Sequence, residues 1–467
     1  MPETPPPRPG LRQRLRTAAR ESVGGLPATF WWLWTSTLVN RLGGFVVTFL
    51  ALYLTVDRGL SPAFAGLVAS LYGLGGSLAS VAGGVLADRI GRRPTLLAAQ
   101  AATATATLAL GLVHPAWAIA VTAAVLGFTS NASRPAVSAI MADLVPAADR
   151  VRAFSLNYWA INIGFAFAAA AAGLIAAHGF LLLFVGDAAT TLLCALVVFA
   201  RVPETRPEAA PVTASAPAPA APRVGLVTVL RDPAFMALVG LTFLLACVAN
   251  QGGVALPIVM GRAGYSPTDY GLVVALNGLL IVLLQIPVTR FVQGRNRALM
   301  LSVAALCTGC GFGLTAFAGS AWFYALTVTV WTAGEMLSVP ANMALVAELS
   351  PVHARGRYQG VYSLAWSGAS FLAPMTAGFL LTASGGDAVW LCCTLLGLVA
   401  AAGYVRLLRE RPQPRLVPLA ARPAVAAAGN ADARSASTSQ GARHGDRNDT
   451  QRRRRHRDQG GGGRRAR

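Results

Sequence analysis

The sequence predicts an all-α polytopic membrane protein with twelve transmembrane helices, arranged as two parallel six-helix pseudo-repeats. Three observations support this fold class. The chain of 467 residues is 54% hydrophobic and only 12% charged, whereas a soluble globular chain carries about 25% charged residues. Twelve apolar stretches are each long enough to cross roughly 30 Å of hydrocarbon as a helix. The two halves of the chain also match each other at one fixed offset.

Charged or proline-containing turns bound the expected spans. In the first half the spans cover 29–54, 62–87, 94–113, 116–140, 153–177 and 180–200. In the second half they cover 233–259, 267–291, 298–318, 321–346, 357–383 and 388–408.

Composition divides the chain into five parts. Residues 203–231 hold six prolines among alanines and charges, which is typical of a flexible linker. The expected parts are a basic cytoplasmic arm (1–28), an N-terminal six-helix bundle (29–202), a Pro/Ala-rich cytoplasmic linker (203–231), a C-terminal six-helix bundle (232–409) and a disordered Arg-rich cytoplasmic tail (410–467).

An internal repeat relates the halves at a shift of 205 residues. Nine of the twenty positions in 133–152 are identical to those in 338–357, including Pro135 and Pro340. Apolar composition alone does not produce matched prolines, arginines and acids. The match indicates duplication of a six-helix unit, and both copies run in the same direction because six is an even number.

Arginine positions predict the topology. The short loops between helices 2–3, 4–5, 8–9 and 10–11 carry ten arginines, whereas the opposite loops carry only Arg58 and Arg262. Positively charged loops stay in the cytoplasm. We therefore expect a multi-pass protein of the cytoplasmic membrane with both termini in the cytoplasm.

Residue usage argues against several functional classes. The net charge is +20, and all 39 basic residues are arginine, so no P-loop or Schiff-base lysine is available. We find no Ser/His/Asp or H-E-x-x-H pattern. Cys307 and Cys310 form a C-x-x-C spacing, but they lie inside an apolar span without flanking ligands and are expected to be small buried hydrophobes. We therefore expect no enzyme activity, cofactor or metal. The arginine run 452–455 is more typical of a tail that meets phospholipid than of nucleic-acid binding, so no nucleic-acid partner is expected.

The turn after the second span carries the most specific motif. Residues 84–93 read G-x-L-A-D-R-x-G-R-R. With twelve helices, a duplication and a central linker, this motif resembles the major facilitator superfamily over residues 29–408, and it is most similar to the drug–proton antiporter branch. In the second half Gln293 replaces Asp88 and Asn296 replaces Gly91, so we expect a single copy of the motif.

The resemblance implies a gate built on this turn. Asp88 is expected to face the N-terminus of helix 11, where helix N–H groups favour an anion. Arg92 is expected to reach Asp143 and help close the cytoplasmic side in the outward-open state. The gating residues are Gly84, Asp88, Arg89, Gly91, Arg92, Arg93 and Asp143.

A second family motif lies in helix 5 and is only partly kept. The small residues Gly164, Ala168, Ala169, Ala172 and Gly173 are present, but the family's proline is absent. Small residues at this spacing permit close helix packing. The missing proline weakens the indication of export.

Polar side chains within the spans mark the candidate transport site, because burying them in a membrane is costly. They concentrate in helices 1, 4, 5, 7, 8 and 10; helices 3, 6, 9 and 12, which the resemblance places at the periphery, offer only Gln100 and Asp187. The candidate substrate or proton residues are Glu335, Arg41, Arg134, Asn40, Asn157, Asn250, Asn277 and Asn342.

Glu335 is the expected proton carrier, since a buried carboxyl near mid-span can load a proton. The alternative is a structural salt bridge or hydrogen bond to an arginine. Arg41 and Arg134 either act on Glu335 or bind substrate, and Asp187 is expected to pack or hydrogen-bond. Five aromatic residues could stack a flat substrate, although packing or an interfacial belt is the favoured interpretation of any single one: Tyr53, Tyr72, Tyr362, Trp159 and Trp366.

The leading functional hypothesis is a monomeric transporter that exports a small amphipathic molecule in exchange for protons by alternating access. Its partners are then a small-molecule substrate, protons and the lipid bilayer. Uptake by proton symport or facilitated diffusion is an alternative that the sequence leaves open. A non-transporting membrane sensor on a transporter scaffold is the alternative from another class.

Overall fold

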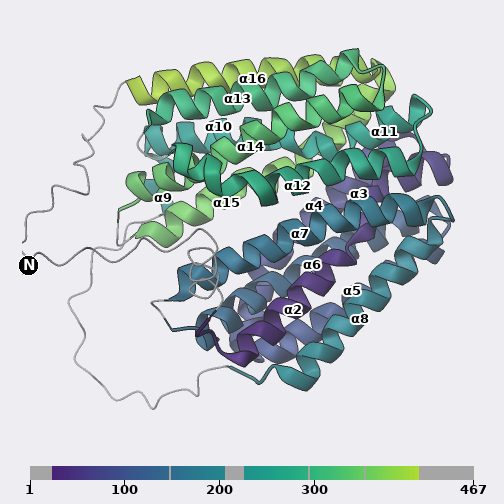
Figure 1. Ribbon diagram of the computed structural model, residues 1–467, viewed down its shortest axis with the longest axis vertical. Helices are drawn as coiled ribbons and strands as arrows, with labels where there is room; N and C mark the ends of the chain where they lie inside the picture. The colour runs from purple at the N-terminus through teal and green to yellow at the C-terminus, as the bar shows by residue number, and fades with distance from the viewer. Residues whose placement is uncertain (1–23, 147–148, 206–225, 293–294, 352–353, 410–467) are drawn as a thin grey trace, which may run out of the picture. The chain divides into compact units, whose positions relative to one another are not determined.

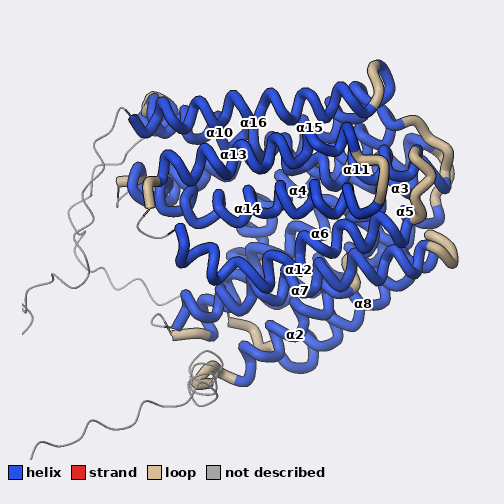
Figure 2. The backbone as a smooth tube through the Cα atoms, turned by 45° about the horizontal axis from the view of Figure 1, so that its top comes forward, coloured by secondary structure: helices blue, strands red, loops and turns tan. Residues whose placement is uncertain are grey.

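The computed structural model describes residues 24–146, 149–205, 226–292, 295–351 and 354–409. The expected N-terminal arm up to residue 23, the tail from residue 410 and linker residues 206–225 lie outside the described residues. Within the described ranges every regular element is a helix, as Figure 2 shows. The predicted all-α class is therefore confirmed.

Figure 1 shows the helices of the two halves, coloured from purple to blue in the first half and from teal to yellow-green in the second. The first half contains α2 (Ala28–Leu42), α3 (Phe45–Leu52), the π-helical turn η1 (Tyr53–Asp57), α4 (Pro62–Arg89), α5 (Arg92–Leu112), α6 (Ala116–Leu144), α7 (Arg150–Ala176) and α8 (Leu181–Arg201). The second half contains α9 (Leu226–Leu230), α10 (Pro233–Ala249), the 3-10 turn η3 (Asn250–Gly253), α11 (Ala255–Arg262), α12 (Pro267–Val292), α13 (Arg297–Gly313), the 3-10 turn η4 (Leu314–Phe317), α14 (Ala321–Leu349), α15 (Arg355–Ala383) and α16 (Gly386–Arg409).

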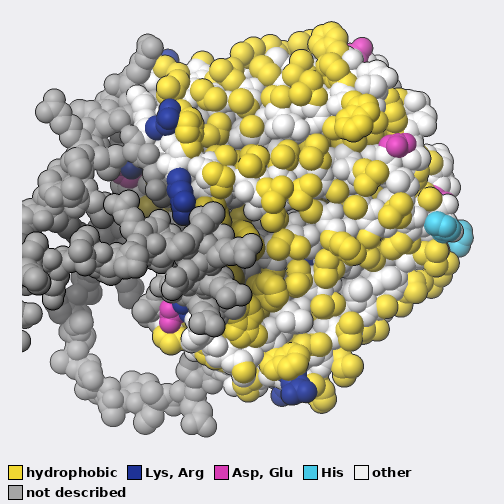
Figure 3. Space-filling view, viewed as in Figure 1, with side chains coloured by type: hydrophobic (Ala, Val, Ile, Leu, Met, Phe, Trp, Pro, Cys, Tyr) yellow, Lys and Arg dark blue, Asp and Glu magenta, His cyan; other side chains and the backbone are white. Residues whose placement is uncertain are grey.

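Eleven helical segments in the described part of the chain are long and apolar enough to cross a membrane. The predicted span not among these eleven, 321–346, corresponds to α14, which has 29 residues but is less apolar because it carries Glu335 and Asn342. On the face shown in Figure 3, hydrophobic side chains cover the middle and charged side chains lie toward the helix ends. This distribution suits a membrane-spanning bundle. Short α9 lies within the predicted linker, so that end of the linker is helical.

The repeat extends through all six helices of each half. Each principal helix of the first half starts 205 residues before its counterpart: Ala28 and Pro233, Pro62 and Pro267, Arg92 and Arg297, Ala116 and Ala321, Arg150 and Arg355, Leu181 and Gly386. Both Ser-Pro pairs begin a helix, because Ser61 and Ser266 accept hydrogen bonds from backbone N–H groups of the first turn and proline suits position N1. The predicted duplication is confirmed.

The first helix of each half is broken, which corrects the expectation of continuous spans. α2 ends before Gly43 and Gly44, and α3 begins at Phe45. A Cβ at Gly43 would lie 1.8 Å from Thr190 Oγ1, so only glycine fits. The carboxylate of buried Asp187 on α8 accepts a hydrogen bond from Val46 N at 3.1 Å and satisfies the new helix start. Asp187 therefore has the hydrogen-bonding role that we predicted. In the second half, η3 separates α10 from α11.

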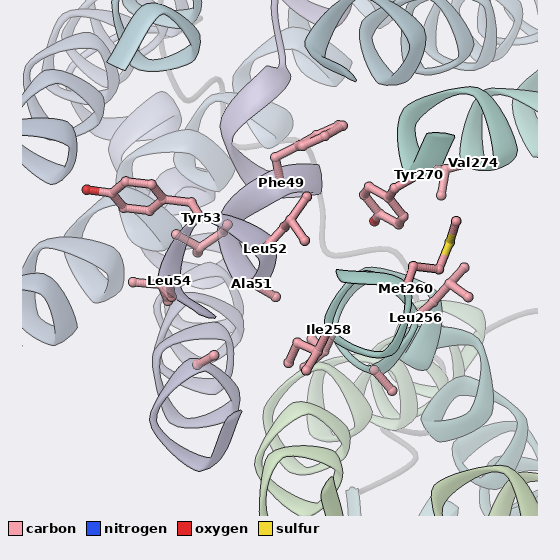
Figure 4. Packing of buried hydrophobic residues seen from close by; sticks show 14 of the residues in the cluster. Phe49, Ala51, Leu52, Tyr53, Leu54, Leu256, Ile258, Met260, Tyr270 and Val274 are labelled. Carbon is pink, nitrogen blue, oxygen red and sulfur yellow. The ribbon is translucent and has the colours of Figure 1, made fainter. Parts of the chain in front are cut away.

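We call the end that holds the turns α4–α5, α6–α7, α12–α13 and α14–α15 the arginine-rich end, and the other end the opposite end. At the opposite end one buried apolar cluster contains residues of both halves. Figure 4 shows Phe49 and Leu52 of α3 beside Tyr270 of α12 and Leu256 of α11. The rings of Phe49 and Tyr270 meet edge to face with centroids 5.1 Å apart, and Tyr270 OH donates to Thr48 O at 3.1 Å.

Glycines bring helices of opposite halves into backbone contact at this end. A Cβ at Gly66 on α4 would lie 2.3 Å from Pro374 O on α15, and a Cβ at Gly271 on α12 would lie 2.5 Å from Ala169 O on α7. The two crossings are copies of each other, because both partners shift by 205 residues. The small residues of α7, which is the fifth predicted span, thus serve close packing as predicted, and those of α15 do the same.

At the arginine-rich end each buried cluster belongs to one half. One comprises residues between Leu26 and Val202, and the other comprises residues between Val229 and Tyr404. The halves therefore share a core at the opposite end and keep separate cores at the arginine-rich end.

Candidate functional site

Two cavities lie beside the helix breaks. The first has a volume of about 440 Å³ and is lined by both halves, including Gly44 of the first break and Asn250 of the second. The second has a volume of about 310 Å³ and is lined only by the first half. Arg41 and Arg134 line both cavities. Broken helices commonly flank the binding sites of secondary transporters, because they expose backbone groups.

Arg41 lies on the last turn of α2, directly before the break, and Gly164 of α7 packs against it. A Cβ at Gly164 would lie 2.4 Å from Arg41 Cβ, so only a residue as small as glycine at this position of α7 leaves room for the arginine. Arg134 lies on α6 and is exposed toward the cavities. The two guanidinium groups are within electrostatic range of each other.

The predicted amides fall into three places. Asn40 and Asn157 line the second cavity, and Asn250 lines the first. Asn277 hydrogen-bonds to Glu335. Asn342 lies elsewhere: its side-chain oxygen accepts a hydrogen bond from buried Tyr404 at 3.4 Å, and it lines neither cavity.

Glu335 is held within the second half. Asn277 Nδ2 of α12 donates to Glu335 Oε2 at 3.1 Å and to Thr332 Oγ1 at 3.0 Å. Glu335 lines neither described cavity and contacts neither Arg41 nor Arg134 in this conformation. The phenol of Tyr158, on α7 of the first half, is within electrostatic range of its carboxyl group. Glu335 therefore lies close to the contact between the halves.

The repeat explains this position. Subtracting 205 from Asn277 and Glu335 gives Tyr72 and Ser130. The Tyr72 and Ser130 hydroxyls also hydrogen-bond to each other, at 3.1 Å. One half thus keeps a neutral pair where the other half holds an ionisable carboxyl.

The predicted gating motif lies at the arginine-rich end, where Arg92 on α5 forms an ion pair with Asp143 on α6. Asp88 and Arg89 end α4 and are exposed, and Asp88 forms no hydrogen bond or ion pair with another described residue. The contact of Asp88 with the N-terminus of the eleventh span, which is α15, is expected in a conformation closed at the arginine-rich end. In the described conformation the two halves have separate cores at this end, so that contact stays a prediction.

The gate is not wholly single-copy, which corrects the sequence interpretation. Arg297 on α13 pairs with Glu348 on α14, and both positions are those of Arg92 and Asp143 shifted by 205 residues. The second half has lost the aspartate and glycine of the motif but keeps its arginine–carboxylate pair. The 205-residue offset could have revealed this second pair in the sequence, because an acid stands at both related positions, Asp143 and Glu348.

Glu204, which follows α8 at the start of the predicted linker, is a residue that sequence reasoning missed. Its carboxylate accepts hydrogen bonds from Arg92 N and Arg93 N, each at 3.1 Å, and so caps the start of α5. Gly91 precedes these residues with φ of 109°, and a Cβ there would lie 2.7 Å from Glu204 Oε2. Gly91 is thus required by both conformation and space, whereas a Cβ at Gly84 would meet nothing within 4 Å.

Aromatic residues form part of the first cavity. Of the five aromatic residues that the sequence suggested, Tyr72 and Trp366 line it, together with Phe165, whereas Tyr53, Tyr362 and Trp159 line neither cavity. Phe165 was not anticipated, because a phenylalanine within an apolar span carries no signal of its own. Within the described residues no group of three or more His, Cys, Asp or Glu is placed to hold a metal ion.

Comparison with known proteins agrees with this architecture. The family model described as Major Facilitator Superfamily matches residues 33–334 and 252–442. The chain belongs to the major facilitator superfamily. The resemblance drawn from residues 84–93 and from the duplication is therefore confirmed.

Similar proteins of this superfamily include transporters with and without an assigned substrate. The chain is 24% identical to the uncharacterized MFS-type transporter YdeE of Escherichia coli (strain K12), over 82% of this chain and 97% of that protein. It is 25% identical to a Na(+), Li(+), K(+)/H(+) antiporter of Planococcus maritimus (74% and 91% covered) and 28% identical to the class C tetracycline resistance protein of Escherichia coli (68% and 80% covered). The fold resembles a crystal structure of the nucleoside transporter NupG, with a TM-score of 0.69 at 15% identity over 81% of this chain and 99% of that one.

Proposed function

We propose that this chain is a secondary active transporter that exports a small amphipathic compound in exchange for protons. The observation that carries the proposal is the placement of charge. Two arginines of the first half line the cavities, and one hydrogen-bonded carboxyl of the second half lies beside the contact between the halves.

Alternating access follows from the two ends of the molecule. The opposite end is sealed by a shared core and by glycine crossings, while the cores at the arginine-rich end are separate. Rocking the halves about the first cavity would open the opposite end and close the arginine-rich end. Closure at the arginine-rich end would bring Asp88 to the start of α15.

Glu335 is the proposed proton site. Its carboxyl belongs to the second half, whereas Tyr158 approaches it from the first. A rocking motion therefore changes the surroundings of the carboxyl group and couples loading and release of its proton to the conformational change. In this proposal Asn277 holds the carboxyl in position, and Arg41 and Arg134 act on the substrate.

The arginine-rich end is proposed to face the cytoplasm, with both termini on that side, because positively charged loops are retained there. The described conformation is then open inward. The name of the tetracycline resistance relative and that of the cation/H(+) antiporter support an export cycle driven by protons. We propose that the monomer is the working unit, because both cavities are completed within one chain.

The test uses everted membrane vesicles with a respiration-driven pH gradient and a panel of fluorescent dyes and antibiotics. We expect at least one compound to dissipate the gradient in vesicles that contain the wild-type chain. Glu335→Gln should abolish this response. Asp57→Asn serves as the matched control because Asp57 is exposed at the opposite end, and it should retain the response.

If compounds bind the purified protein but neither the compounds nor protons are transported, the result contradicts the proposal and favours a sensor. A compound that moves in the same direction as the proton would identify a symporter instead.

A further inference from the structure

The cavities hold positive charge without a balancing carboxylate. Arg41 and Arg134 line both cavities, and no aspartate or glutamate is among the lining residues. Two carboxyl groups within the described spans are engaged elsewhere: buried Asp187 caps α3, and half-buried Glu335 accepts from Asn277. The space between the halves therefore has a local charge of +2 in this conformation.

The guanidinium group of Arg41 is incompletely satisfied. Arg41 Nε is buried and has no hydrogen-bond partner among the described residues. Arg41 also lies within electrostatic range of Arg134, so two like charges share a partly desolvated space. Leaving a buried charged donor unpaired is costly. An anion between the two arginines would satisfy the donors and remove the repulsion.

The neighbouring side chains add polar groups to this cavity. Asn157 lines it beside the arginines and its amide nitrogen can donate to an anion, whereas the Ser133 hydroxyl already donates to Ser130 O at 2.9 Å. Asn157 Oδ1 is buried without a partner, as is Gln100 Oε1 on the same wall. Both atoms are amide oxygens that accept hydrogen bonds, so water or a donor group of a ligand can pair with them, whereas an acid anion is left to the arginines and the Asn157 amide nitrogen.

The first cavity adds an apolar side to this polar one. Tyr72, Phe165 and Trp366 line it next to Arg41 and Arg134. Its volume of about 440 Å³ lies in the range of small-molecule sites. A ligand that fills it can contact both the arginines and the aromatic rings.

We infer that the substrate of this site is a small aromatic organic acid bound as its anion. Its acid group is held by Arg41 and Arg134, and its ring lies against Tyr72, Phe165 and Trp366. Guanidinium groups suit this role because their planar donors match a carboxylate in pairs. The inference rests on the proposed function and specifies the substrate class of the same site.

The repeat keeps the acid and proton sites apart. The positions of Arg41 and Arg134 become Ala246 and Val339 in the second half, while the position of Glu335 is Ser130 in the first. The two cavity arginines thus belong to the first half, and Glu335 belongs to the second. An anion on the first half and a proton on the second can therefore be bound by different residues.

The binding test uses matched probes and the purified full-length chain in detergent. The probes are 1-naphthoate, its neutral amide 1-naphthamide and the cation 1-naphthylmethylammonium, which share the ring and differ in charge. Binding is followed by the quenching of tryptophan fluorescence and by thermal stabilisation. We expect naphthoate to bind at least about tenfold more tightly than the amide, as a hydrogen-bonded charge contact implies. The cation should bind most weakly.

Variants assign the preference to the arginines. Arg134→Gln should remove the tenfold preference for the acid, because Arg134 is exposed to the cavity and its replacement leaves the packing intact. Arg134→Lys should recover part of it, since the charge returns without the paired donors. Arg290→Gln removes an exposed arginine that lines neither cavity and should keep the full preference.

Equal affinity for acid and amide, tighter binding of the cation, or an unchanged acid preference in Arg134→Gln would each overturn the inference. Failure of the proposed function gives a different pattern. If naphthoate binds through Arg134 but drives no proton movement, the substrate class stands and the antiport proposal fails.

Discussion

Adding a methyl group at Gly66 or Gly271 is expected to shift the protein away from the described conformation. Both glycines sit where helices of opposite halves cross at the opposite end. Neither is needed for its backbone conformation, because both lie inside long helices at negative φ. Alanine in place of either residue therefore acts on the crossing and favours the helix itself.

The size of the effect follows from the crossing distances. The new Cβ at Gly66 would lie 2.3 Å from Pro374 O, and ordinary van der Waals contact begins at 3.4 Å. The two helices must therefore separate by about 1 Å, since both nearest groups are backbone. Overpacking of this kind costs about 1–3 kcal/mol. If that cost falls only on the conformation closed at the opposite end, the balance between the two conformations shifts by about 5- to 150-fold.

Pulsed electron–electron spin resonance between two spin labels measures this shift. One label pair, at Val85 and Gln359, reports on the arginine-rich end; a second pair, at Leu112 and Phe317, reports on the opposite end. All four positions are exposed, and the labels are placed on a chain whose native cysteines have been replaced. Gly66→Ala and Gly271→Ala should shorten the first distance and lengthen the second.

Gly240→Ala is the matched control, because a Cβ at Gly240 meets nothing within 4 Å and α10 tolerates the change. The control should leave both distances at their wild-type values. If Gly66→Ala and Gly271→Ala also leave both distances unchanged while the protein remains folded, the crossings do not set the conformational balance and the reasoning fails.

Three further predictions concern stability, measured as apparent unfolding midpoints at one scan rate. Glu204→Gln should lower the stability by about 1 kcal/mol, because a neutral amide caps the first turn of α5 less well than a carboxylate; an unchanged midpoint would show that the cap is dispensable. Asp187→Ala should cost about 1–3 kcal/mol by leaving buried N–H groups of α3 unpaired, and Asp187→Asn, which keeps an acceptor, should cost less; equal losses would contradict the capping role. Arg297→Glu should destabilise by up to about 1 kcal/mol by facing Glu348 with a like charge, and the swap Arg297→Glu with Glu348→Arg should recover most of the loss; a swap no better than the single variant would refute the pairing.

Most of the fold could be predicted from the sequence, because a membrane-spanning helix is recognisable as a long apolar stretch of residues. The 205-residue offset was visible between the second and fifth helices of each half, where matched prolines and arginines made it detectable. It reached the first and sixth helices only in the structure, since their apolar residues carry no such signal. The search for polar side chains within the spans also identified Arg41 and Arg134, which line the cavities.

Long-range contacts could not be predicted in the same way. The break after Arg41 depends on Asp187, which caps α3 from a helix more than a hundred residues away. Gly43 and Gly44 look like a tolerated pair inside a span until that contact is seen. Glu204 was assigned to a flexible linker, because the proline-rich composition after it obscured its docking on Arg92 and Arg93.

The partner of Glu335 was also beyond the sequence. Arginine was the expected alternative partner, because charges of opposite sign in a membrane commonly pair. The structure instead places an amide, Asn277, against the carboxyl in this conformation. Which of several polar residues on neighbouring helices meet depends on helix rotation, which the spacing within each span does not determine.

Proton movement in proteoliposomes tests the central claim most directly. The wild-type chain and Glu335→Gln are reconstituted with a pH-sensitive dye inside, and a gradient of a transported compound from the vesicle panel is imposed without a pre-existing pH gradient. The account predicts that the compound drives proton flux through the wild type. Glu335→Gln should abolish this flux and still exchange labelled for unlabelled compound. Undiminished proton flux in Glu335→Gln would contradict the account.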